Sequence, residues 1–146
     1  MSELINGKFP EKFRKEYEQI FKNEKPLFIV VGDLAIKGGY SESAVCVTKD
    51  RIYAFDGNFH GNVFSLDFKD IKKTKVKRMY GNAIFFADTV KRKRVRLMRF
   101  TFADANVADA ASDFINAVIK EGYSDELIYA VENTYEKQRS FCPKCG

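Results

Sequence analysis

The sequence predicts an α+β domain in which about seven antiparallel strands form a curved sheet or barrel and a C-terminal helix caps its open end. Between residues 26 and 102, short apolar or alternating segments are separated by Gly, Asn and Asp turn signals, as in antiparallel sheets. The apolar spacing then becomes helical from residue 104 to residue 121. With 146 residues, 45% of them hydrophobic, the chain matches one domain with its own core. A general α+β sheet with helices on one side is the alternative.

The N-terminal part predicts a helix followed by a bent strand. Pro10 suits the first turn of an amphipathic helix over residues 10–24. The apolar stripe of this helix consists of Phe13, Tyr17, Ile20 and Phe21. The next segment, LFIVVGDLAIKG, predicts a strand that bends near Gly32, because glycine lets another backbone approach closely.

Three short strands are expected between residues 43 and 68. They are SAVCVTK, which contains Cys46 in a buried strand, then RIYAFD, and then VFSLDF. Lys49-Asp50 predicts a tight turn between the first two. A longer turn rich in Gly and Asn precedes the third strand and contains the only histidine, His60.

The clearest hairpin in the sequence joins KKTKVKRMY to AIFFADT, with Gly81-Asn82 as a two-residue turn signal. A last strand, KRVRLMRFTF, follows it. If side chains alternate strictly, one face of this strand carries Arg94, Arg96, Met98, Phe100 and Phe102. The other face would carry Val95, Leu97, Arg99 and Thr101. Neither face is purely apolar, so alternation does not decide which one is buried.

Two helices are expected at the C-terminal end. The first runs to Glu121, with Asp104 or Asn106 as its cap and Gly122 as its end, and the second begins at Ser124. The chain is therefore divided into an N-terminal helix (1–25), the sheet domain (26–122), a trailing helix or linker (123–141) and a terminal cysteine motif (142–146).

The charge of the chain is concentrated in one segment. Residues 69–99 hold twelve Lys and Arg but only Asp70 and Asp88, a net charge of +10, whereas the remainder carries −5. Such a segment attracts anionic partners: acidic lipid headgroups, nucleic acid or an acidic protein face. The candidate contact residues are Lys72, Lys73, Lys75, Lys77, Lys91, Arg92, Lys93, Arg94 and Arg96. The alternative is a pair of solvated strands whose charges prevent edge pairing.

The chain ends in FCPKCG, where Cys142 and Cys145 have the spacing of one half of a zinc ribbon. A tetrahedral zinc needs four ligands, and neither Cys46 nor His60 is placed to complete the set. We therefore expect a half site that holds zinc only if the chain continues with a second pair, and weak zinc binding at most without one. A redox role is disfavoured because no thioredoxin-like unit surrounds the motif.

The element order, the run TKDRIYAFD and the terminal CPKCG together resemble the cytosolic N-terminal region of certain bacterial ABC exporters. The resemblance covers residues 25–146. In that family a pleckstrin-homology-like (PH-like or GRAM-like) domain precedes a zinc ribbon, so the resemblance implies a PH-like fold. It also implies a non-catalytic regulatory or interaction domain, whose partner is a protein or another domain of the same transporter. No G-x-x-x-x-G-K-[ST] motif is present, so ATP hydrolysis would belong to a longer parent protein.

An anionic membrane surface is the second possibility, although residues 32–50, where PH domains usually bind phosphoinositides, carry only Lys37 and Lys49. A cytoplasmic location is expected because the chain starts without an apolar signal segment. Either a transporter partner or an anionic membrane would place it at the inner face of the cell membrane.

Nucleic-acid binding and catalysis are weaker alternatives. Phe85, Phe86 and Tyr80 lie near the basic strands and could stack on bases, but paired phenylalanines in a strand favour a core position. Carboxylates for a catalytic pair could come from Asp56, Asp67 and Asp70. These occupy expected turns, where Asp is a turn former, so we expect no enzyme activity from this chain.

Overall fold

The computed structural model describes residues 4–5, 9–37, 39–101, 105–127 and 129–130. The N-terminal half contains β1 (Leu4–Ile5), the 3-10 turn η1 (Glu11–Phe13), α1 (Arg14–Ile20), β2 (Phe28–Leu34), β3 (Tyr40–Val47), β4 (Arg51–Phe55) and η2 (His60–Asn62). The C-terminal half contains β5 (Val63–Asp67), η3 (Phe68–Asp70), β6 (Ile71–Met79), β7 (Asn82–Thr89), β8 (Arg94–Phe100) and α2 (Ala105–Glu121).

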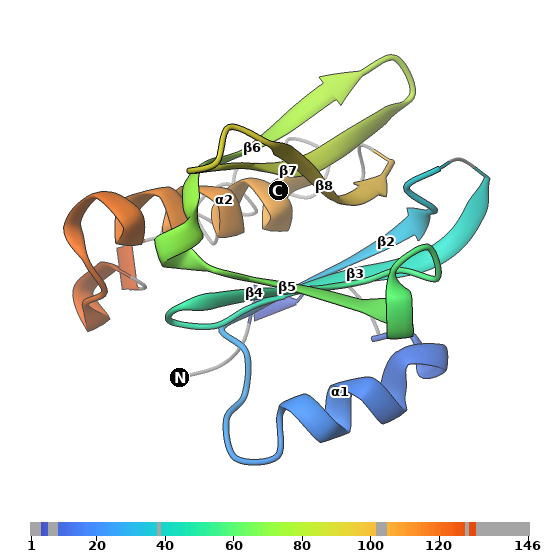
Figure 1. Ribbon diagram of the computed structural model, residues 1–146, viewed down its shortest axis with the longest axis horizontal. Coiled ribbons are helices and arrows are strands. Elements are labelled where there is room, and N and C mark those ends of the chain that lie inside the picture. Colours follow the sequence, from blue (N-terminus) through green and yellow to red (C-terminus); the bar gives the residue numbers. More distant parts are fainter. Residues whose placement is uncertain (1–3, 6–8, 38, 102–104, 128, 131–146) are drawn as a thin grey trace, which may run out of the picture.

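Seven strands form an antiparallel sheet in the order β5-β4-β3-β2-β8-β7-β6, which confirms the predicted α+β class and strand number. The short β1 pairs in parallel with β2. The sheet is open, with β5 and β6 as its ends, and it folds into two layers that diverge from the contact between β2 and β8 (Figure 1). On that contact Leu34 lies opposite Arg99.

The predicted bend at Gly32 is confirmed, and it brings β2 against β8. The pairing of β2 with β3 shifts between Gly32 and Leu34. A methyl group at Gly32 would lie 2.5 Å from Met98 Cε and 3.0 Å from the Arg99 carbonyl oxygen. A side chain at this crossing would require Met98, Ser43 or the Arg99 carbonyl to move, so glycine is strongly favoured here.

The main core lies between the two layers and α2, which is positioned beside β6 as a C-terminal cover (Figure 1). The rings of Phe28 from β2 and Phe114 from α2 are 5.2 Å apart, and both side chains are fully buried. Full burial of one such side chain contributes about 1.5–3 kcal/mol. Gly122 ends α2 as predicted, with a φ of 86° and its N–H donating to the Val118 carbonyl oxygen at 2.7 Å.

A second apolar cluster forms on the opposite face of β2, β3 and β4, where α1 packs (Figure 1). Phe9 and Phe13 pack on Phe55, with ring centroids 5.3 and 5.9 Å apart. The helix predicted over residues 10–24 is shorter than expected. It ends at Ile20 because Phe21 leaves the helical conformation and its ring packs edge-on against Tyr53 of β4.

The predicted β6–β7 hairpin is confirmed, but its turn lies one residue earlier than expected. Met79 pairs with Asn82, so Asn82 already belongs to β7 and the turn residues are Tyr80 and Gly81. Gly81 has a φ of 79°, the conformation that glycine tolerates best.

The trailing helix begins after Ser124, whose hydroxyl accepts from the Leu127 N–H at 3.2 Å. Helical residues continue through 125–127 and 129–130, and the remainder of the predicted trailing helix lies outside the described residues. Within the described ranges, none of the helices combines the length and the apolar character needed to cross a membrane.

Candidate anion-binding face

Strand alternation places three lysines of β6 on the face of the sheet that points away from the core. Thr74 and Val76 are buried toward α2, whereas Lys73, Lys75 and Lys77 are exposed on the opposite face. Several hydrogen bonds hold β6 against the helix, and two of them reach the Thr74 backbone. Asn116 of α2 bonds both to the Thr74 N–H, at 2.7 Å, and to the Thr74 carbonyl oxygen, at 2.9 Å. The lysines are therefore held in a fixed direction, away from the core.

A β-bulge in β8 decides which arginines join them. Phe85 pairs with Met98 but the next residue, Phe86, pairs with Arg96, so Leu97 is an extra residue in β8. As a result Leu97 and Met98 are both fully buried. The predicted grouping of Arg94 and Arg96 with Met98 and Phe100 is therefore wrong, because the bulge reverses the alternation after Arg96.

The outward residues of β6, β7 and β8 form three cross-strand rows. The rows are Lys73–Asp88–Arg94, Lys75–Phe86–Arg96 and Lys77–Ile84–Arg99. We call these nine residues the cationic face. It has a column of lysines on β6 and a column of arginines on β8, and between them the residues of β7. The two cationic columns are separated by two strand spacings, about 9–10 Å. The cationic face thus contains six cations and one acid, Asp88.

Asp88 forms an ion pair with Arg94 and fixes the orientation of its guanidinium group. Arg94 Nε lies 2.9 Å from Asp88 Oδ1, and the Arg94 guanidinium carbon lies 4.1 Å from the centre of the Phe86 ring. The hydrogen bond from Arg94 lowers the pKa of Asp88, and desolvation opposes it. The nearby charges of Arg94, Lys73 and Lys72 also lower this pKa, each by less. Within the described residues, the other five cations of the face form no ion pair.

An open hollow of about 350 Å³ lies on the cationic face. It is lined by Lys77, Met79, Ile84, Phe86, Arg94 and Arg96. We call the side chains of Met79, Ile84 and Phe86 the apolar strip. Ile84 and Met79 are half-buried, so their apolar atoms remain partly in contact with water. The hollow therefore offers an apolar floor with positive charge on both sides.

The remaining predicted cations lie at one end of the face. Lys72 is exposed at an irregularity of β6, and Lys91, Arg92 and Lys93 belong to the turn between β7 and β8. This turn is closed by the Thr89 N–H, which donates to the Lys93 carbonyl oxygen at 2.8 Å. These four residues form a second group, the end cluster, beyond the row that contains Asp88.

Sequence reasoning missed three residues of the site: Met79, Ile84 and Arg99. The alternation of AIFFADT could have indicated that Ile84 and Phe86 share a face. No local signal places Arg99 beside them, because its position depends on the bulge at Leu97 and on the pairing with β7.

The phenylalanines considered for base stacking are core residues, as predicted. Phe85 is fully buried and only 3% of Phe86 is exposed, beneath the Arg94 guanidinium. Tyr80, at the tip of the hairpin, is fully exposed. A single exposed ring on a turn is a poor platform for successive bases.

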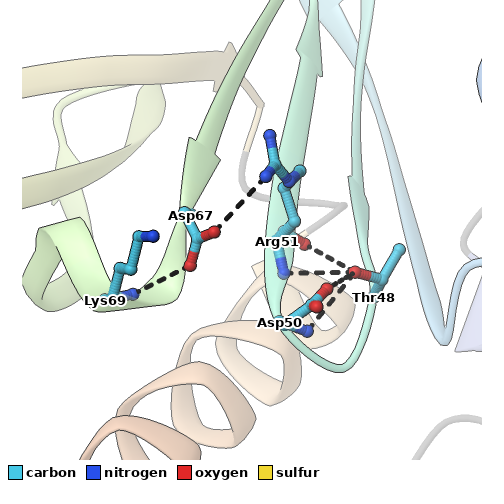
Figure 2. A network of polar contacts seen from close by, with 5 residues as sticks. All are labelled: Thr48, Asp50, Arg51, Asp67 and Lys69. Carbon is cyan, nitrogen blue, oxygen red and sulfur yellow. Dashed lines mark hydrogen bonds and ion pairs between the residues drawn. The ribbon is translucent and has the colours of Figure 1, made fainter.

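Two of the three carboxylates considered for catalysis, Asp56 and Asp67, hold turns together. In Figure 2, Asp67 of β5 accepts from the Lys69 N–H at 3.2 Å and pairs with the Arg51 guanidinium at 3.3 Å. Beside them, the Thr48 hydroxyl accepts from the Arg51 N–H at 3.1 Å and closes the turn between β3 and β4. The buried Asp56 accepts from the Asn58 N–H at 2.8 Å, also a turn contact.

The possible metal ligands are not brought together by the described part of the chain. His60 is exposed in the connection between β4 and β5, and Cys46 is buried in β3. In the described residues, no group of three or more His, Cys, Asp or Glu side chains is arranged to hold a metal. Cys142 and Cys145 lie outside the described residues, so the zinc half site stays a prediction.

No protein-family model matches the sequence, and a search of curated proteins finds no match. The resemblance to the exporter domains therefore rests on the sequence motifs and their order.

Proposed function

We propose that this chain is a non-catalytic interaction domain that docks onto an anionic partner through its cationic face. One observation carries the proposal: the lysines of β6 and the arginines of β8 form two columns on one side of the sheet, with Asp88 as the only acid among them. Cations held this close repel one another, and a partner that supplies carboxylates or phosphates relieves that repulsion.

Edge protection alone accounts poorly for this arrangement. Charged side chains on the end strand β6 are expected where a protein must avoid pairing with another chain. The arginine column, however, lies on β8, which pairs with β7 along its length and meets β2 at Arg99. The bulge at Leu97 adds Arg99 to the cationic side of β8, although an unbroken alternation would have split the column.

An acidic protein surface is the partner class that we favour. The cationic face combines charge with the apolar strip, as protein interfaces do, and the phenylalanines beneath it are not exposed for stacking on bases. The resemblance to bacterial exporters suggests where such a surface would be found: on another domain of the same transporter, at the cytosolic side of the membrane. That location is part of the proposal.

An anionic membrane is the second candidate, and the tip of the β6–β7 hairpin favours it. Tyr80 is fully exposed there, beside the half-buried Met79, and tyrosine is enriched at membrane interfaces. The end cluster adds further cations, each contributing about 1 kcal/mol near an acidic surface.

Charge reversal tests the proposed function. The variant Lys75→Glu/Arg96→Glu reverses both cations of the central row, and Lys22→Glu/Lys25→Glu makes the same change of charge at exposed residues between α1 and β2. Binding of fluorescent poly-L-glutamate is measured by anisotropy at low and high salt. We expect the control to bind like the wild type and the row variant to bind at least about tenfold more weakly, since exposed ion pairs contribute up to about 1 kcal/mol each. Equal affinities of the two variants would refute the proposal.

Vesicles separate the two candidates. Co-sedimentation with phosphatidylserine-containing and neutral vesicles is compared for the wild type and Tyr80→Ser. The membrane candidate requires binding that depends on phosphatidylserine and weakens in the Tyr80 variant. Absence of vesicle binding, together with binding of the acidic polypeptide, would leave the protein partner alone.

A further inference from the structure

The apolar strip in the middle of the cationic face has no role in binding a purely ionic partner. A ligand that offers only charge would leave Met79 and Ile84 facing water, and would meet only the cations on either side. Burying the exposed parts of these side chains is favourable in proportion to their apolar area. The partner that fits the whole hollow is therefore amphipathic, with an apolar line flanked by acids on both sides.

The spacing of the columns matches an α-helix. The lysine and arginine columns are about 9–10 Å apart at the backbone, and a helix with its side chains is about 10–12 Å wide. Successive rows along β7 are separated by two residues, about 6.5–7 Å. Acids at i and i+4 of a helix are about 6 Å apart, so they reach successive rows, and the flexible Lys and Arg side chains accommodate the difference.

An extended peptide fits this face less well than a helix. On the face of a sheet, as opposed to its edge, an extended chain finds no backbone partners, and its N–H and C=O groups would lie against the apolar strip. A helix satisfies its own backbone groups and presents only side chains. A lipid bilayer would meet the protruding lysines and arginines first and leave Ile84, on the floor of the hollow, without contact.

We propose that the apolar strip is the binding site of an acidic amphipathic α-helix of a partner protein, which places apolar side chains over Met79 and Ile84 and carboxylates against both cationic columns. The apolar contact ends at Asp88, whose carboxylate occupies the central position of the next row. The contact thus covers about two helical turns. This inference rests on the proposed function and names the class of partner that the same face would bind.

The test uses two synthetic acidic peptides of identical composition. In the striped peptide, Leu recurs at i, i+3, i+4 and i+7 with Glu on both sides; in the permuted peptide, the same residues are shuffled so that Leu and Glu do not segregate. Binding to the full chain is measured by fluorescence anisotropy, and the helicity of the peptide is followed by circular dichroism. We expect the striped peptide to bind at least about tenfold more tightly and to become helical, because it alone buries an apolar line on the strip.

Variants of the strip locate the contact. Ile84→Thr keeps a β-branched residue in β7 while removing apolar surface, and Val90→Thr makes a comparable change at an exposed residue outside the face. Ile84→Thr should abolish most of the preference for the striped peptide, whereas Val90→Thr should preserve it. Met79→Gln is the second strip variant, needed if Ile84→Thr lowers the melting temperature.

The outcomes separate the helix site from the proposed function. If both peptides bind equally and Lys75→Glu/Arg96→Glu weakens both, the domain binds anions but the helix site is wrong. If the striped peptide is preferred but neither Ile84→Thr nor Met79→Gln reduces that preference, the helix binds elsewhere. If neither peptide responds to the charge reversal, the proposed function itself fails. Binding to phosphatidylserine vesicles without binding to the striped peptide would also overturn the helix site and favour the membrane.

Discussion

Replacing Asn116 with alanine removes the side chain through which α2 satisfies the outer edge of β6. The Asn116 side chain accepts from the Thr74 N–H at 2.7 Å and donates to the Thr74 carbonyl oxygen at 2.9 Å. The amide therefore supplies the donor and acceptor that a further strand would supply. Thr74 is 3% exposed, so water reaches its backbone poorly once the amide is gone.

The expected loss follows from these two bonds. Each buried backbone group that loses its partner costs about 1–3 kcal/mol. The edge is partly open around Asn116, which is half-buried, so the lower part of that range applies and the gross loss is about 2.5–3.5 kcal/mol. Alanine regains about 0.5 kcal/mol of helix propensity. The net loss in the free energy of unfolding for Asn116→Ala is therefore about 2–3 kcal/mol.

Urea denaturation monitored by circular dichroism measures this loss. Lys120→Ala, at an exposed position of the same helix, is the control and should change stability by less than about 0.5 kcal/mol. Asn116→Asp keeps an acceptor for the Thr74 N–H but loses the donor, so it should fall between the wild type and Asn116→Ala. A loss below about 1 kcal/mol for Asn116→Ala would refute the reasoning, because it would mean that water replaces the amide.

Three further substitutions probe the crossing of the layers, the acid of the cationic face and a carboxylate on α2. Gly32→Ala should cost about 1–3 kcal/mol in thermal unfolding, since the new methyl group would lie 3.0 Å from the Arg99 carbonyl oxygen; an unchanged melting temperature would contradict the close packing. Asp88→Asn should tighten binding of poly-L-glutamate, because it removes the only acid of the face, and weaker binding would mean that the orientation of Arg94 matters more than net charge. Desolvation and then the charge of Asp109 raise the pKa of Asp113 in the folded state. Its ionised form therefore opposes folding in full above the raised pKa, and this cost declines as the pH falls through the raised pKa and is gone below the unfolded pKa. Asp113→Asn should therefore be more stable than the wild type at neutral pH, with a difference that shrinks in acid; equal stability at all pH values would contradict this shift.

The elements were predictable where the signal is local. Apolar residues at helical spacing and Gly122 predicted α2, and alternation with turn residues predicted the strands. The errors occurred at boundaries, where tertiary contacts compete with propensity. Phe21 leaves the helix to pack on Tyr53, and Asn82 pairs with Met79 as part of β7. Neither contact is encoded in the spacing of neighbouring residues.

The candidate site was predictable in composition but not in arrangement. The concentration of Lys and Arg in residues 69–99 identified the segment, and five of the nine residues named from it belong to the cationic face. The other four form the end cluster. Met79, Ile84 and Arg99 were missed because a row joins three strands, and the register between strands is not visible along one of them.

By itself, the sequence determined that the chain forms an antiparallel sheet with a C-terminal helix and that its net positive charge is concentrated in residues 69–99. Only the tertiary structure decided that this charge forms two columns beside an apolar strip. The reason is that side-chain alternation is a property of each strand alone, whereas the single extra residue at Leu97 is accommodated by pairing with β7 and by burial in the core. That bulge buries Met98 and turns Arg99 outward, beside Ile84.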